Sequence, residues 1–156
     1  MKQRISPFVN GAAAMKAVYA LGSYVMKCPD QRLHDLISFR ISQINGCAYC
    51  LDMHSKDLRA DGETEQRLYM LDAWRESSLY SERERVALAW AEAVNDLHDG
   101  HVCDEVYDEA QKLFSEKELI DLTMGVLAIN CYNRINIAFR TPAGDYKVGQ
   151  HAVHAN

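Results

Sequence analysis

Residues 33–60 read LHDLISFRISQINGCAYCLDMHSKDLRA and contain two helical patterns separated by Asn45-Gly46. In the first half, apolar residues recur every three or four positions, which places them on one face of a helix. This face holds Leu33, Leu36, Ile37, Ile41 and Ile44. Asn-Gly and Asp-Gly pairs typically end helices, so a second helix is expected from Cys47 to about Ala60, before Asp61-Gly62.

The rest of the chain continues the helical pattern. Prolines occur only at positions 7, 29 and 142, so 112 consecutive residues contain none, which favours uninterrupted helices. Thr64 is expected to begin a short helix through Leu71. No stretch alternates apolar and polar residues as a strand does. The sequence therefore predicts an all-α fold of six to eight helices.

Two Ser-x-x-Glu capping boxes mark later helix starts, because each serine and glutamate satisfy the other's free backbone N–H. The box at residues 81–84 predicts a helix that carries Trp90 and Leu97 and ends at Asp99-Gly100. The box at residues 115–118 predicts a helix to about Phe139. That segment is apolar on nearly all sides up to Ile129, which indicates the central buried helix.

The length of 156 residues is that of a single domain. We expect a helical domain over residues 1–140. Residues 141–156, with Pro142, Gly144 and Gly149, are expected to form an extended tail. Such a tail either frays or lies on a neighbouring subunit.

Charge and cysteine content narrow the functional classes. The net charge of −5 disfavours binding to nucleic acid or to anionic membranes. Residues 79–156 carry 13 acidic and 7 basic side chains, which indicates a solvated acidic face. Five cysteines at uneven spacing do not form a secreted disulfide framework, and no signal peptide or spanning segment is recognised. A reducing, cytoplasmic location is therefore expected.

The pair Cys47 and Cys50, with His54 one turn further on, carries the clearest chemical signal. On a helix these three residues share one face. Free N–H groups and the macrodipole at a helix start favour a thiolate, and His54 can accept the Cys50 proton or pair with its thiolate. A thiolate beside a second thiol can reduce a peroxide, because the resulting sulfenic acid condenses with that thiol to a disulfide.

Two other interpretations of these residues stay open. Both cysteines can be small buried apolar residues, with His54 merely hydrogen-bonded. Cys47, Cys50 and His54 can also be three zinc ligands, with a fourth from His98, His101 or Cys103. Structural zinc cysteines usually lie on tight turns, however, whereas this segment continues as a helix.

Asp35 is a candidate partner for His54. It lies twelve residues before Cys47, on the helix that precedes the motif. If the two helices pack as a hairpin, Asp35 approaches the imidazole and can hold the ring or relay a proton through water. By pattern alone, a surface aspartate in a first helical turn, favoured by the dipole, is the better explanation.

Residues 40–54, RISQINGCAYCLDMH, resemble the core motif of the AhpD-like alkylhydroperoxidases in the carboxymuconolactone decarboxylase superfamily. The likeness continues through Tyr69, residues 74–77 and residues 82–93, and ends at residues 129–134. It covers roughly residues 5–145 of the chain.

The resemblance implies an all-helical subunit in a homotrimer or homohexamer, and a peroxidase whose cysteine pair cycles between dithiol and disulfide. Cys50 would form the sulfenic acid and Cys47 would resolve it, while His54 and Asp35 would relay protons. The expected partners are a small peroxide and a thiol reductant, either a protein or a small molecule. Neither a cofactor nor a metal is expected.

Two positions depart from the family pattern. Well-studied members carry glutamate where this chain has Asp35, and histidine where it has Tyr49. The shorter acid calls for a bridging water, and a relay with fewer bases suggests a slower peroxidase or a different oxidant. Two alternatives remain: a carboxymuconolactone decarboxylase-type lyase, which has no use for two thiols, and a non-enzymatic redox sensor whose disulfide changes oligomer packing.

Overall fold

The computed structural model describes residues 2–151, without the side chain of His98. These residues form eight α-helices and two short 3-10 helices and contain no strand, which confirms the predicted all-α class. The elements are α1 (Pro7–Asn10), α2 (Ala12–Val25), α3 (Gln31–Asn45), α4 (Ala48–Ala60), α5 (Glu65–Met70), η1 (Leu71–Glu76), α6 (Glu82–Asn95), η2 (His98–Gly100), α7 (Asp104–Leu113) and α8 (Glu116–Phe139).

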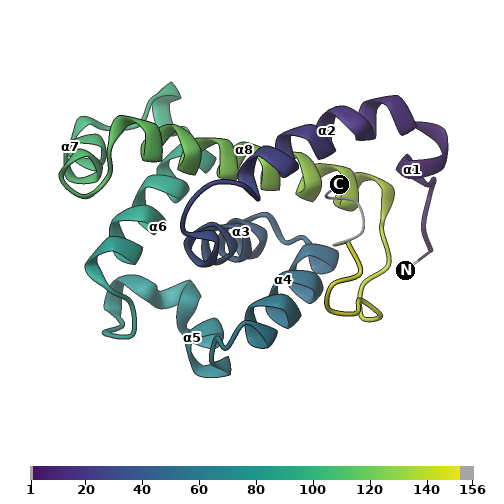
Figure 1. Cartoon of the computed structure of the whole chain (residues 1–156), viewed down its shortest axis with the longest axis horizontal. Coiled ribbons are helices and arrows are strands. Elements are labelled where there is room, and N and C mark those ends of the chain that lie inside the picture. The colour runs from purple at the N-terminus through teal and green to yellow at the C-terminus, as the bar shows by residue number, and fades with distance from the viewer. Residues whose placement is uncertain (1, 152–156) are drawn as a thin grey trace.

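Helix α3 is the centre of the fold. It packs against α4, α6 and α8, and Figure 1 shows it nearly end-on beneath α8. Ile37 and Ile41 are fully buried on its predicted apolar face, but Ile44 is 43% exposed. Ile44 was wrongly placed in the core, because α3 ends one residue later and the chain turns away at Gly46.

The predicted central position of the helix over residues 116–139 is confirmed, since α8 packs against α2, α3, α4, α6 and α7, but the helix is not buried on all sides. On α8, Ile120 is 59% exposed and Leu127 is 46% exposed. Helix α3 is more enclosed although it is less apolar, because polar side chains such as Arg40 and Ser42 hydrogen-bond inside the protein. Hydrophobicity along the sequence does not reveal such pairing.

Arg40 shows how α3 buries a charge. Its guanidinium is 10% exposed and bonds Glu92 of α6 at 2.6 Å, and a second bond reaches Asp72, whose side chain is 80% exposed. Glu92 also accepts from the Trp74 indole at 2.9 Å. This carboxylate therefore joins α3, α6 and η1.

Glu92→Gln is expected to lower the free energy of unfolding by about 3 kcal/mol, because it leaves the buried Arg40 charge without its main counter-ion. Urea denaturation monitored by circular dichroism measures this. Asp72→Asn is the matched control, since a pair with a solvent-exposed carboxylate contributes about 0–1 kcal/mol. Equal losses in the two variants would contradict the account.

The predicted helix starts are confirmed. Thr64 caps α5, and both capping boxes are present, Ser81 with Glu84 and Ser115 with Glu118. Helix α6 ends at Asn95, before the expected stop at Asp99-Gly100, and Leu97 is exposed. Helices α1, α2 and α7 were not foreseen from the sequence. Among the described helices, none combines the length and apolarity needed to cross a lipid bilayer.

The segment after α8 folds back on α4 of its own chain (Figure 1). The Asp52 carboxylate accepts from the backbone N–H of Gly144 at 2.8 Å and of Tyr146 at 3.2 Å. Lys56 donates to the carbonyls of the same two residues. Packing of this tail on a neighbouring subunit stays a prediction, and residues 152–156 lie outside the described residues.

Candidate active site at the start of helix α4

The turn between α3 and α4 positions the first cysteine. Gly46 ends α3 with a φ of 68°, a left-handed conformation that favours glycine. The Cys47 N–H then donates to the Ser42 carbonyl at 3.1 Å. Cys47 becomes the N-cap of α4, and its sulfur accepts the Cys50 backbone N–H at 3.4 Å. A sulfur thus occupies a capping position where an oxygen is usual.

The structure brings Cys47 and Cys50 together, and each is 1% exposed. Both are free thiols. Hydrogen bonds from Cys50 lower the pKa of Cys47 to about 7. The same contact with Cys47, together with burial, raises the pKa of the Cys50 thiol. Cys47 is therefore the more acidic of the two thiols and is about half ionised at pH 7, while Cys50 keeps its proton.

This order of pKa values is the reverse of the one expected from a histidine beside Cys50. The N-cap position provides hydrogen bonds to the Cys47 sulfur. In the described part of the chain, no hydrogen bond joins His54 to Cys50. The assignment of the sulfenic acid to Cys50 stays a prediction, because a resting charge does not decide which sulfur reacts.

His54 lies one turn beyond Cys50, and its Nε2 is buried without a hydrogen-bond partner. Burial lowers the pKa of His54 to about 4. The ring is therefore neutral at pH 7, with one nitrogen directed into the protein interior. Such a nitrogen can exchange a hydrogen bond or a proton with a molecule that enters beside it.

Asp35 is held on α3, half-buried, next to other acids of α4. Burial, followed by the charges of Asp61 and Asp57, raises its pKa to about 6. Within residues 2–151 no hydrogen bond connects Asp35 with His54. The structure does not bring these two side chains into contact, so the relay between them stays a prediction. A carboxyl with this pKa can both accept and release a proton near neutral pH.

The two pKa shifts make opposite contributions to stability below pH 6.5. The folded state binds the His54 proton only near pH 4, so stability is lost as the pH falls from about 6.5 to 4. The folded state binds the Asp35 proton already near pH 6, so stability is gained as the pH falls from 6 to about 4.

His54→Asn is therefore expected to match the parent protein at pH 7 and to be more stable at pH 4.5, by about 2–3 kcal/mol. Asp35→Asn should be more stable than the parent at pH 7 and lose that advantage at pH 4.5. Urea unfolding of the three proteins at both pH values measures this. An identical pH response in all three would show that neither shift is real.

Asparagines of α8 complete the site, and the sequence analysis missed their role. Asn136 donates to the Cys50 sulfur at 3.4 Å. The fully buried Asn133 donates to the Ser42 hydroxyl at 3.1 Å and also lowers the pKa of Cys47. The sequence signal for them is weak, because Asn130 and Arg134 stand in the same segment of α8 and residue type alone does not show which amide is buried.

The tail adds a second histidine close to α4. The Tyr49 hydroxyl lies 2.8 Å from Nε2 of His151, and the Tyr146 ring stacks on the same imidazole. The Tyr146 hydroxyl donates to Asp57 at 2.9 Å, the carboxylate that faces Asp35. The resembling family carries a histidine where this chain has Tyr49. Here the Tyr49 hydroxyl instead hydrogen-bonds the imidazole of His151.

The zinc alternative finds no support in the geometry. Across the described residues, no three His, Cys, Asp or Glu side chains lie together in a way that could hold a metal ion. Cys103 is exposed and His101 bonds only its own loop. The side chain of His98 lies outside the described part of the structure.

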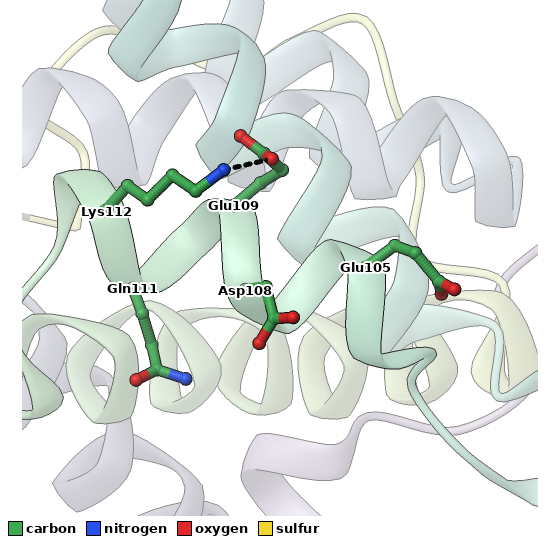
Figure 2. A pocket seen from close by; sticks show the side chains of 5 residues that line it. All are labelled: Glu105, Asp108, Glu109, Gln111 and Lys112. Carbon is green, nitrogen blue, oxygen red and sulfur yellow. Dashed lines mark hydrogen bonds and ion pairs between the residues drawn. The ribbon is translucent and has the colours of Figure 1, made fainter.

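A surface hollow on α7 lies apart from the cysteine pair. It is lined by Glu105, Asp108, Glu109, Gln111 and Lys112. Figure 2 shows these side chains pointing in different directions, with an ion pair between Lys112 and Glu109. Because these five side chains do not converge on one point, we assign the candidate active site to the groups around α4.

Comparison with known proteins agrees with this arrangement. The model of the carboxymuconolactone decarboxylase family matches residues 12–93. The uncharacterized protein YdfG of Bacillus subtilis (strain 168) is 39% identical over 139 residues, which cover 88% of this chain and 95% of YdfG.

Solved structures show the same fold. A protein of unknown function from Agrobacterium tumefaciens, described as a candidate antioxidant defence protein AhpD, is 38% identical. It superposes with a TM-score of 0.88 over 93% of this chain and 100% of that chain. A variant of the debrominase Bmp8, bound to 2,3,4-tribromopyrrole, gives a TM-score of 0.77 at 22% identity, over 88% of this chain and 74% of that chain. This last likeness shows the fold alone.

The family match spans more than half of the chain, and the match to the Agrobacterium protein spans its whole length. The resemblance seen in residues 40–54 is thereby confirmed. The chain belongs to the carboxymuconolactone decarboxylase family and is one of its AhpD-like members.

Proposed function

We propose that this protein is a thiol-dependent peroxidase in which Cys47 and Cys50 cycle between dithiol and disulfide. The observation that carries the proposal is the pair itself: two free thiols one helical turn apart, with the Cys47 sulfur at a helix N-cap and its pKa lowered to about 7. A thiolate at neutral pH beside a second thiol is what peroxide reduction requires.

In the first step, the Cys50 proton passes to the Cys47 thiolate, and the Cys50 sulfur attacks the terminal oxygen of the peroxide. The O–O bond breaks and an S–O bond forms. The sulfur loses two electrons, and the leaving alkoxide takes a proton and departs as an alcohol. We expect His54 and Asp35 to move that proton. Both cysteines are 1% exposed, so the peroxide reaches the sulfur only when surrounding side chains move.

In the second step, the Cys47 sulfur attacks the Cys50 sulfenic acid. An S–S bond forms, the S–O bond breaks, and hydroxide leaves with a proton as water. A thiol reductant then restores the dithiol by exchange. Both reacting cysteines therefore belong to this chain, while an external thiol reductant supplies the electrons.

We also expect a homotrimer or homohexamer. The support is an exposed apolar side of α8, where Ile120 is 59% exposed and Leu127, two turns on, is 46% exposed. Apolar side chains aligned along one helix are typical of a surface that another chain covers. Light scattering coupled to size-exclusion chromatography measures the assembly.

The test of the function is peroxide consumption by the whole protein, with cumene hydroperoxide or hydrogen peroxide and a panel of dithiol donors that includes a lipoylated protein. Catalytic consumption with at least one donor supports the proposal. Disulfide formation without turnover under any donor would favour the redox-sensor alternative. Decarboxylation of a muconolactone by a protein with both thiols alkylated would favour the lyase.

A further inference from the structure

The negative charge of the cysteine pair has no cationic partner in the structure. Among residues 2–151, no lysine, arginine or histidine side chain hydrogen-bonds either sulfur. The side-chain donor to Cys50 is instead the neutral amide of Asn136, with Nδ2 at 3.4 Å from the sulfur. An amide N–H stabilises a thiolate more than a thiol, because only the thiolate is a strong acceptor.

The orientation of the neighbouring amide is fixed by its surroundings. The single Ser42 hydroxyl proton is donated to the Ser38 carbonyl at 2.7 Å. The Ser42 oxygen can therefore only accept from Asn133, which places the NH₂ group of Asn133 on that side. The Asn133 oxygen accepts from Asn45 at 2.9 Å. The amide cannot flip without breaking both bonds.

This fixed NH₂ group faces the cysteine pair. Hydrogen bonding from Asn133 lowers the pKa of both cysteines, and hydrogen bonding from Asn136 lowers that of Cys50. The two amides lie on adjacent turns of α8. Burying the Asn133 amide costs free energy that an apolar residue would not, which points to a use beyond packing.

We propose that Asn136, supported by the fixed Asn133 amide, is a catalytic residue that stabilises negative charge on the Cys50 sulfur when the proton leaves it. This assignment deepens the proposed peroxidase function, because it names the group that allows Cys50 to attack although Cys47 is the more acidic thiol at rest. Only the expected effect of Asn136 on turnover rests on the proposed peroxidase function. The effect on the thiol itself is independent of any peroxide.

The other groups that face the pair must be considered in any pH measurement. From α4 these are Tyr49, His54 and the second cysteine. From α3 the group is Ser42, and from α6 the packed side chains are apolar. The amides and the serine do not titrate near neutral pH. His54 does not titrate above pH 6, because burial lowers its pKa to about 4. Tyr49 and the His151 imidazole on its hydroxyl are unchanged in the variants below.

The experiment measures the pKa of Cys50 alone, in a Cys47→Ser parent. Serine is itself a favoured N-cap, so the turn is kept. The rate of alkylation by iodoacetamide is followed from pH 6 to 11, with peptide mass mapping of residue 50 to separate it from the other cysteines. Adding Asn136→Leu, which keeps the size but removes the donor, is expected to raise the midpoint by about one pH unit. Below both midpoints that means about tenfold less thiolate.

Two control variants separate the effect of the amide's hydrogen bond from the effect of side-chain shape. Adding Ile137→Ala to the same parent, a change in an exposed neighbour on α8, should leave the midpoint unchanged. Adding Asn136→Asp should raise the midpoint further than leucine does, because a carboxylate repels the thiolate. This variant also serves if the leucine variant does not fold. Midpoints within roughly 0.3 units of the parent in both Asn136 variants would overturn the proposal, whether or not the protein consumes peroxide.

Discussion

Cys50→Ser is expected to reduce peroxide turnover by roughly 10³-fold or more, to the uncatalysed background. A serine hydroxyl cannot form a sulfenic acid, and the remaining Cys47 lacks a neighbouring thiol to resolve one. Because Cys50 is buried among well-packed residues and the substitution removes little volume, the fold should be retained. Steady-state peroxide consumption with an excess of the best dithiol donor measures the loss.

The control for this variant is Cys103→Ser. Cys103 is exposed and lies at the start of α7, away from the pair. Its removal should leave turnover unchanged. Loss of activity in Cys103→Ser, or activity near the parent level in Cys50→Ser, would show that the wrong sulfur had been assigned.

Cys47→Ser is expected to give a different loss. Turnover should stop, but one equivalent of peroxide should still be consumed per chain, because Cys50 can be oxidised once and no thiol then resolves it. Dimedone, which reacts with sulfenic acids, should label residue 50 after a single addition of peroxide. Peptide mass mapping locates the label.

The same labelling in Cys50→Ser separates the two sulfurs. Cys47 is the more acidic thiol in the resting pair, and attack by Cys50 requires that its proton first moves to the Cys47 thiolate. If Cys50→Ser instead shows the single-equivalent burst with dimedone on residue 47, then Cys47 is the attacking sulfur. The disulfide cycle would then stand with its two roles exchanged.

Local signals in the sequence were sufficient to predict much of the fold. The capping boxes at residues 81–84 and 115–118 form as expected, because each depends only on residues three apart. Burial was harder to predict. Arg40 lies inside the protein because Glu92, 52 positions away, meets it there, and no local pattern contains that information.

In the candidate site, too, local spacing was predictable and contacts between distant residues were not. Cys47, Cys50 and His54 were found because their spacing on one helix is visible in the sequence. Asn136 was missed because its contact with Cys50 joins residues 86 positions apart. Likewise, the hydrogen bond of Tyr49 to His151 depends on how the tail returns over α4, which turn and helix patterns do not specify.

Which of the two cysteines has the lower pKa depends on a smaller structural detail. The sequence presents two opposing effects, a helix start that favours a thiolate on Cys47 and a histidine that favours one on Cys50. The outcome depends on whether the imidazole reaches the sulfur, and His54 makes no hydrogen bond to it within the described residues. Residue spacing favoured a thiolate on Cys50, because a specific base usually outweighs a helix dipole, and the geometry gives the reverse order.

The central claim is that Cys47 and Cys50 form a redox-active disulfide. It is tested most directly by adding one equivalent of peroxide to the fully reduced protein, then alkylating and measuring intact and peptide masses. The account predicts a loss of two hydrogens per chain, located in a disulfide between Cys47 and Cys50, that a dithiol reverses. Persistence of both thiols, or oxidation confined to Cys28, Cys103 or Cys131, would contradict it.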